Sequence, residues 1–141
     1  MECVFCHIVR GEAAAHLVYE DRAVVAFLDA RPLFEGHVLV VPREHLPTLT
    51  DLPPQLLGPY YAVVRRLAGA VQTAMGAEGS FVAANNRVSQ SVPHFHTHVV
   101  PRRRKDGLRG FFWPRGRYPD AARAAEVARR VREVVSADGA G

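Results

Sequence analysis

Three histidines stand at alternate positions in one short segment of the sequence, Ser91–Pro101, which reads SVPHFHTHVVP. Successive side chains of a β-strand point to opposite faces, so a strand here places His94, His96 and His98 on the same face. Imidazole side chains bind metals, attack as nucleophiles and transfer protons near neutral pH. Three polar rings on an otherwise apolar strand are costly to bury for packing alone, so the segment predicts a chemical function.

The three imidazoles are expected to divide their roles. Along an extended strand the Cα atoms of His94 and His98 lie roughly 13 Å apart. A zinc ion holds nitrogen ligands at about 2.0–2.1 Å. One ion can therefore bind two neighbours of the set, but it cannot bind all three.

Cys3 and Cys6 are the only cysteines of the chain. Two thiols three residues apart cannot form a disulfide framework, and in a cytosolic chain such a pair more often binds metal or acts in redox chemistry. One helical turn between them points both thiolates to the same side. The residue pattern leaves three interpretations open: a metal site, a redox pair and two unused thiols.

The hydrophobic pattern predicts the strands that position these residues. Strands are expected over 17–19, 23–29, 37–41, 80–85 and 94–100, and the last of them carries the histidines. A short helix over residues 2–10 carries the cysteines and ends at Gly11. The order of helices and strands predicts a single α+β domain with an antiparallel sheet.

Two longer helices are predicted by apolar residues at spacings of three or four. The central helix ends near Gly76–Gly79, and its stripe consists of Tyr60, Val64, Leu67, Val71 and Met75. Pro53 and Pro54 suit its opening, whereas Pro59 lacks a backbone donor, so the helix either restarts or kinks there. After Asp120, a suitable N-cap, a last helix carries the apolar residues Ala124, Val127, Val131 and Val134.

Length and composition limit the class of protein. The chain has 141 residues, of which 48% are hydrophobic and 23% charged, as in one compact domain. Folding at this length buries roughly 68% of the unfolded surface, so a core forms without a metal or disulfide. Collagen-like, disordered and disulfide-scaffold classes are excluded. No signal peptide and no apolar run of about 20 residues is visible, which predicts a cytoplasmic protein without membrane contact.

The basic residues are concentrated in one stripe. Of the 18 basic residues 17 are arginine, and Pro101–Arg117 carries seven basic residues and one acid. Such a stripe attracts polyphosphate. With Phe111, Phe112 and Trp113 interleaved, it also suits stacking on nucleic-acid bases. A bias in genome base composition explains the arginine excess equally well.

The sequence resembles the histidine triad (HIT) superfamily of nucleotide hydrolases and transferases. HFHTHVV matches the family pattern His-φ-His-φ-His-φ-φ, with Thr97 as a mild departure. The segments CVFCHIVRGE, YED, AFLD and GHVLVVPREH fall in family order, so the resemblance covers residues 2 to about 101. It implies a HIT-like fold with a short N-terminal, a central and a C-terminal helix. We expect a HIT domain over 1–118 with a basic rim at 101–118, and a helical tail of the same domain at 119–141.

The resemblance implies cleavage of a nucleoside phosphate at the α-phosphorus through a covalent nucleotidyl-histidine. His96 corresponds to the nucleophile, His98 to the residue that stabilises charge or protonates the leaving group, and His37 to a phosphate-side histidine. Histidine rather than glutamine at position 98 favours a hydrolase over a transferase. The implied nucleotide-binding residues are Gln90 and Ser91 at the phosphates, Asp29 at the ribose, Asn85 (chosen over Asn86) and, in the base pocket, Phe5, Ile8, Phe27 and Leu28. The turn over 85–90 is shorter than in many family members and has Ser89 in place of a glycine.

The family branch with this CxxC pair adds two histidines, which correspond to His45 and His94. The resemblance therefore implies a closed, structural Cys2His2 zinc site. That site would pin the N-terminal helix to two strands and leave His94 out of catalysis. The resemblance also implies a homodimer, and it gives no role to His7 and His16, which are expected at the surface.

Three functions are consistent with these observations. The first is a hydrolase of nucleoside phosphoramidates or dinucleoside polyphosphates. The second is a nucleotide- or RNA-binding module with residual hydrolysis, in which the basic stripe is the working surface. The third is an aprataxin-like removal of adenylate from nucleic-acid ends, although no further Cys/His set follows His98 to form the finger of such an enzyme.

Overall fold

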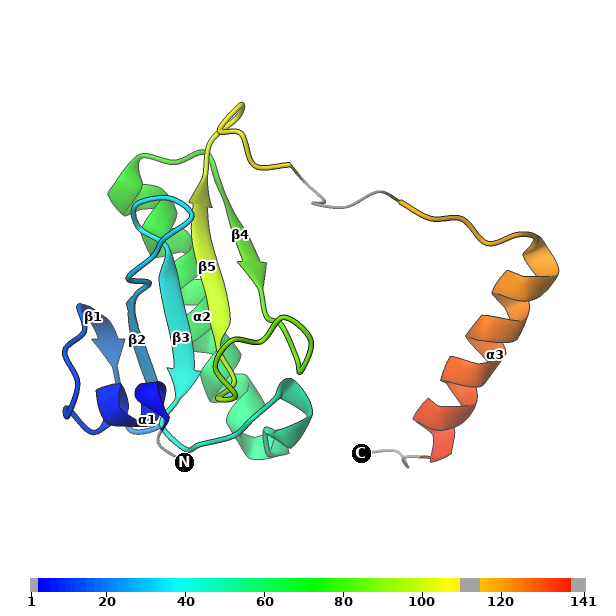
Figure 1. Cartoon of the computed structure of the whole chain (residues 1–141), viewed down its shortest axis with the longest axis horizontal. Helices are drawn as coiled ribbons and strands as arrows, with labels where there is room; N and C mark the ends of the chain where they lie inside the picture. The colour runs from blue at the N-terminus through cyan, green and yellow to red at the C-terminus, as the bar shows by residue number, and fades with distance from the viewer. Residues whose placement is uncertain (1–2, 110–114, 138–141) are drawn as a thin grey trace. The chain divides into compact units, whose positions relative to one another are not determined.

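The computed structural model describes residues 3–109 and 115–137, and the chain divides into two units, residues 1–106 and 107–141. The first unit is built on a five-stranded antiparallel sheet in the order β1-β2-β3-β5-β4 (Figure 1). Its strands are β1 (Leu17–Glu20), β2 (Val24–Leu28), β3 (Val38–Pro42), β4 (Gly79–Ala83) and β5 (Thr97–Arg102). This sheet, with the helices described next, confirms the predicted α+β class.

The two faces of the sheet carry separate hydrophobic clusters. Helix α2 (Pro54–Met75) lies behind the sheet in Figure 1, and its Tyr60, Val64 and Val71 pack against strand residues such as Val24 and Val40. The short helix α1 (Val4–Val9) covers the opposite face, where Phe5 packs with Val25, Phe27, Leu39 and Val41. Because β2 and β3 are covered on both faces, their sequences are almost continuously apolar.

Helix α2 does not restart at its internal proline. It runs from Pro54 through Pro59 to Met75 and ends where Gly76 adopts the left-handed backbone conformation, with φ of 61°. There the Ala77 N–H donates to the Gln72 carbonyl at 2.8 Å, which closes the last turn. A one-turn 3-10 helix, η1 (Leu49–Asp51), precedes α2. Among the described residues, no helix combines the length and apolar composition needed to cross a bilayer.

The histidine strand is shorter than predicted. It begins at Thr97 rather than His94, because the segment before it takes partners outside the ladder: the Phe95 N–H donates to the Leu46 carbonyl at 2.6 Å. The predicted alternation nevertheless persists. Phe95 and Thr97 face Tyr60 of α2. The rings of His94 and His96 turn to the α1 side of the sheet, where both contact Phe5.

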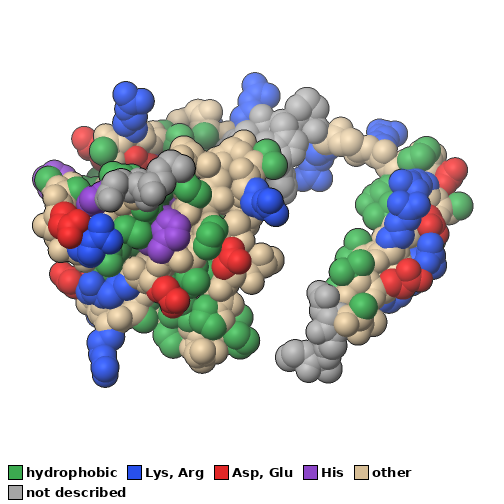
Figure 2. Space-filling model, turned by 60° about the horizontal axis from the view of Figure 1, so that its bottom comes forward, with side chains coloured by type: hydrophobic (Ala, Val, Ile, Leu, Met, Phe, Trp, Pro, Cys, Tyr) green, Lys and Arg blue, Asp and Glu red, His purple; other side chains and the backbone are tan. Residues whose placement is uncertain are grey.

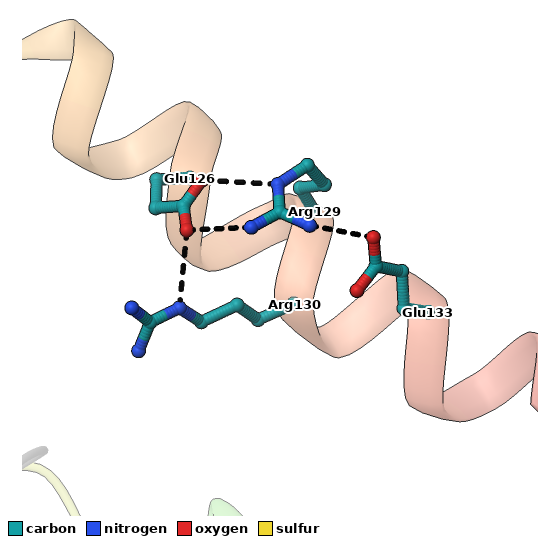
Figure 3. A network of polar contacts seen from close by, with 4 residues as sticks. All are labelled: Glu126, Arg129, Arg130 and Glu133. Atoms are coloured by element: carbon teal, nitrogen blue, oxygen red, sulfur yellow. Dashed lines mark hydrogen bonds and ion pairs between the residues drawn. The ribbon is translucent and has the colours of Figure 1, made fainter.

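The second unit contains the predicted last helix, α3 (Ala121–Ala137). The Asp120 carboxylate accepts from the Arg123 N–H at 2.7 Å, which confirms the expected cap. Glu126, Arg129, Arg130 and Glu133 form a chain of ion pairs along this helix, with distances of 2.5–3.2 Å (Figure 3). None of its described side chains is buried, so solvent screens these exposed pairs and they contribute little to stability.

Candidate functional site

Four potential metal ligands that lie far apart in the sequence meet beside α1. The Cys6 Sγ lies 3.3 Å from His45 Nδ1 and 3.5 Å from His94 Nδ1, and the Cys3 Sγ lies 3.5 Å from His94 Nδ1. All four ligand atoms lie within 4.8 Å of one another. A tetrahedral zinc ion, bonded at about 2.3 Å to sulfur and about 2.0 Å to nitrogen, separates such atoms by about 3.5 Å. The cluster therefore has the ligand types and the spacing of a zinc site.

The hydrogen bonds around the cluster prepare its atoms for a metal. His94 is fully buried, and its Nε2–H donates to the Pro42 carbonyl at 2.8 Å, which leaves the Nδ1 lone pair facing the thiols. Burial also lowers the pKa of His94, which favours the neutral, ligating ring. The Cys3 Sγ accepts from the Cys6 N–H at 3.4 Å and so caps α1.

A cavity of about 820 Å³ lies on the α1 side of the sheet, within the usual volume of small-molecule sites. The four predicted base-pocket residues line it, namely Phe5, Ile8, Phe27 and Leu28. Its polar wall includes Asp29, Ser91, His96 and His98. Figure 2, which turns the α1 end of the first unit toward the viewer, shows histidine side chains at the surface beside apolar ones.

His96 is held in one tautomer. A carbonyl oxygen can only accept, so the 2.8 Å contact between His96 Nδ1 and the His94 carbonyl is an N–H donated by the ring. In the neutral ring the other nitrogen, Nε2, then carries a lone pair. The ring is only 4% exposed and packs edge-on against Phe5, with centroids 5.1 Å apart. A neutral imidazole with a free Nε2 in a cavity wall is equipped for nucleophilic attack.

A second pair of histidines forms a directed chain of hydrogen bonds. The Leu33 N–H donates to His37 Nδ1 at 3.0 Å, so the proton of His37 is on Nε2. That Nε2–H donates to His98 Nδ1 at 3.0 Å, so the proton of His98 is on its own Nε2. Burial, and to a smaller extent the neighbouring His96 and His37, lower the pKa of His98 to about 4. Both rings of this chain are neutral at pH 7, because burial lowers the pKa of His37 as well.

Asp29, His37 and His98 also bring three potential ligand atoms within 4.8 Å. The Asp29 Oδ2 lies 3.6 Å from His37 Nε2. A metal at this place would have to displace the Nε2 proton of His37 while the Leu33 N–H still occupies Nδ1, which would leave an unfavourable imidazolate. This trio is suited to holding a proton rather than a metal.

Two predicted nucleotide-binding residues, Asn85 and Gln90, do not line the cavity. Both ends of the Gln90 amide are engaged: Nε2 donates to the Pro47 carbonyl at 2.7 Å, and Oε1 accepts from the Arg87 N–H of its own loop at 2.9 Å. The Asn86 side chain accepts from the Leu49 N–H at 2.8 Å, so its carbonyl oxygen already makes a structural hydrogen bond. The contacts of Asn85 and Gln90 with a nucleotide stay predictions.

The sequence analysis did not predict two polar residues of the cavity wall, His16 and Arg31. The His16 carbonyl accepts from the Leu28 N–H at 3.0 Å, which brings the segment before β1 beside the end of β2. The Arg31 N–H donates to Asp29 Oδ1 at 2.8 Å, so its position two residues after that acid was a usable signal. His7 contacts Glu12 at 2.9 Å and is not part of the cavity wall.

Part of the basic stripe is neutralised within the first unit. Arg102 pairs with Asp106 at 2.6 Å, and Arg104 pairs with Glu78 at 3.0 Å. Arg103 donates to the Met75 carbonyl at the end of α2. The aromatic residues Phe111, Phe112 and Trp113, which suggested base stacking, lie outside the described residues.

Comparison with known proteins places these features in a family. The HIT domain model matches residues 10–105. The chain is 43% identical over 110 residues to an uncharacterized HIT-like protein of Mycobacterium tuberculosis, covering 77% of this chain and 76% of that protein. It is 36% identical over 109 residues to an adenylylsulfatase of Arabidopsis thaliana, covering 76% of this chain and 55% of the plant protein. It is 30% identical over 118 residues to an adenosine 5′-monophosphoramidase of Candida albicans, covering 79% and 78%.

Solved structures give the same result. A member of the HIT family from Bacillus subtilis superposes with a TM-score of 0.85 at 29% identity, covering 94% of this chain and 96% of that one. A Zn-bound histidine triad family protein from Mycobacterium smegmatis superposes with a TM-score of 0.72 at 39% identity, covering 97% and 98%. Sequence and fold agree, and the chain belongs to the HIT, or histidine triad, family.

Proposed function

We propose that this protein is a nucleotide hydrolase that cleaves at the α-phosphorus of dinucleoside polyphosphates or nucleoside phosphoramidates through a nucleotidyl-His96 intermediate. The observation that carries the proposal is the hydrogen bond from His96 Nδ1–H to the His94 carbonyl. It leaves the Nε2 lone pair free in the wall of a cavity of about 820 Å³. Family membership supports the proposal, since the relatives include proteins named an adenylylsulfatase and an adenosine 5′-monophosphoramidase.

The hydrogen bonds of the site support a proposed role for each histidine. His96 Nε2 forms a bond to the α-phosphorus while the bond to the leaving group breaks, and the ring becomes positively charged. The His94 carbonyl, at 2.8 Å from Nδ1, stabilises that charge. His98 offers its Nε2–H to the developing negative charge, and His37 holds His98 in this tautomer. Water then attacks the phosphorus, and the phosphorus–nitrogen bond breaks with its electron pair returning to Nε2, which restores the neutral ring. The water gives up one proton to solvent, and a nucleoside monophosphate leaves.

The remaining cavity residues would bind the nucleotide. The apolar side chains of Phe5, Ile8, Phe27 and Leu28 form walls suited to a base, and the Asp29 carboxylate can accept from ribose hydroxyls. Ser91 offers a hydroxyl to the phosphates from the wall that also carries the histidines. Gln90 can join it only if its amide exchanges the Pro47 carbonyl for the substrate.

The four-residue cluster is proposed to bind one structural zinc ion per chain. Cys3, Cys6, His45 and His94 supply four ligands, which leave no open position on a tetrahedral ion. A bound zinc would cross-link α1 to the two segments that contain His45 and His94. The likeness to a Zn-bound family member at 39% identity supports this assignment.

A homodimer is proposed as the assembly, on family resemblance alone. Light scattering at micromolar concentration should give twice the 15.5 kDa chain mass. A monomer mass with full activity would contradict it.

Turnover assays with and without nucleic acid test the proposed function. Adenosine 5′-phosphoramidate, adenylyl sulfate and a diadenosine polyphosphate should be offered in turn, and at least one should release AMP at a rate that excess oligonucleotide does not change. Steeply salt-dependent binding of the oligonucleotide without turnover would instead support the binding module. Release of AMP only from adenylated nucleic-acid ends would support the aprataxin-like activity.

A further inference from the structure

We infer that the metal-ligand cluster of Cys3, Cys6, His45 and His94 positions His96, the proposed nucleophile. His94 makes this connection, because its side chain belongs to the cluster and its carbonyl accepts a hydrogen bond from His96. This inference rests on the proposed function, since it concerns the orientation of the residue proposed as nucleophile. His94 presents Nδ1 to the two thiols at 3.5 Å, donates Nε2–H to the Pro42 carbonyl at 2.8 Å, and accepts the His96 Nδ1–H at its own carbonyl at 2.8 Å. His94 is thus a positioning residue: the contacts that fix its side chain also fix the acceptor that sets the tautomer of His96.

The backbone of this segment has few other restraints. Residues 94–96 precede β5, so no ladder hydrogen bonds hold them in register. The Phe95 N–H donates to the Leu46 carbonyl, and Leu46 directly follows the cluster residue His45. The segments around 45 and 94 are therefore joined by this backbone hydrogen bond and by the hydrogen bond from His94 Nε2–H to the Pro42 carbonyl. A bound metal would also join both segments to α1, and its loss would remove that connection.

A second connection runs through α1. Cys3 caps this helix and Cys6 lies within it, while Phe5 between them packs edge-on against both His94 and His96, with centroid distances of 6.0 and 5.1 Å. A helix of six residues is not stable by itself. A metal held by the two cysteines would therefore fix the Phe5 wall against the His96 ring.

The expected consequence is a loss of rate without an equal loss of nucleotide affinity. A displacement of about 1 Å in a reacting group can cost about 100-fold in rate. The base walls formed by Phe27 and Leu28 of β2 do not depend on the cluster. We expect kcat to fall at least about tenfold on metal loss, and the Kd for AMP to rise by a smaller factor.

His45→Ala is the most informative variant, because this exposed residue is a cluster ligand but does not line the cavity. His45→Cys, which keeps a zinc ligand, is the conservative partner. Val63→Ala is the matched control, since Val63 is 6% exposed in the core on the α2 side and its truncation destabilises the fold without touching either site. Zinc content, kcat, KM, AMP affinity and amide hydrogen exchange are measured for each protein at a temperature where circular dichroism shows it folded.

The inference predicts a zinc-free His45→Ala with lower kcat and faster exchange in residues 3–9 and 93–97, and near-normal values for His45→Cys and Val63→Ala. A folded, zinc-free His45→Ala with the kcat and exchange pattern of the wild type would overturn it, as would an equal loss of kcat in Val63→Ala. If His45→Ala does not fold, the wild type stripped of zinc by a chelator replaces it, and a folded, zinc-free wild type with unchanged kcat and exchange pattern would also overturn the inference. Absence of turnover in the wild type would refute the proposed function, while the exchange pattern would still decide the inference.

Discussion

The Nε2 atom of His37 lies 3.0 Å from the Nδ1 atom of His98, and one proton joins the two rings. His37 directly precedes β3, and His98 lies in β5, the strand that pairs with β3. The register of these two strands therefore brings the two histidines together. The Leu33 N–H at His37 Nδ1 sets the direction of the bond. As a result the remaining proton of His98 is on the nitrogen that does not face His37.

Acid should destabilise the fold through His98. Its pKa is about 4 in the folded chain and about 6.5 in an unfolded one. Between these values the unfolded chain binds more protons, so the free energy of unfolding falls as the pH is lowered from about 6.5 to about 4 and is at its full value above that range. His98→Asn, which cannot take up the proton, should show a shallower fall. Denaturant titrations at several pH values check this, and equal slopes in the two proteins would contradict it.

His96→Ala should abolish turnover of adenylated substrates and leave the fold and nucleotide binding largely intact, because it removes the attacking nitrogen but not the cavity. His98→Ala should reduce turnover less, since that ring stabilises charge without forming a bond. Steady-state kinetics and calorimetric titration with AMP measure the two effects separately. Wild-type turnover in His96→Ala would show that another group attacks.

Cys3→Ser should lower the melting temperature and reduce zinc content below one ion per chain. The cysteine supplies both a ligand of the cluster and the cap of α1, and loss of a structural metal costs folding free energy directly. Elemental analysis and thermal unfolding check the prediction. A wild-type protein without zinc, in which both thiols titrate freely in the native state, would show that the cluster is not a metal site.

Tyr60→Phe should cost about 1–2 kcal/mol of unfolding free energy. The Tyr60 hydroxyl is fully buried and lies 2.8 Å from both the Val40 carbonyl and the Thr97 hydroxyl, and a buried acceptor that loses its partner costs about that much. Tyr118→Phe is the control, because Tyr118 is 59% exposed and should change stability by less than about 0.5 kcal/mol. A cost as small for Tyr60 as for Tyr118 would be inconsistent with this hydrogen-bond network.

The sequence predicted those parts of the site that depend on local periodicity. Alternation placed His94, His96 and His98 on one side, and this holds although the strand starts only at Thr97, because Phe95 and Thr97 remain buried against Tyr60. The family motif likewise predicted the four residues that meet in the metal cluster.

Features that depend on tertiary contacts were not predictable from one sequence. The tautomers of His37 and His98 follow from a single backbone N–H at Leu33. His16 enters the cavity wall beside the pairing of β1 with β2, whose register shifts between Leu17 and Tyr19. No hydrophobic pattern encodes such a shift.

Trapping the covalent intermediate shows whether His96 is the nucleophile. Wild-type enzyme should be mixed with a nucleoside phosphoramidate, quenched during turnover without acid, digested and mapped by mass spectrometry. We expect one nucleoside monophosphate per chain attached to the peptide that contains His96, with none on the same peptide of His96→Ala. A nucleotide attached to another residue, or turnover with no trapped nucleotide and full activity in His96→Ala, would contradict it.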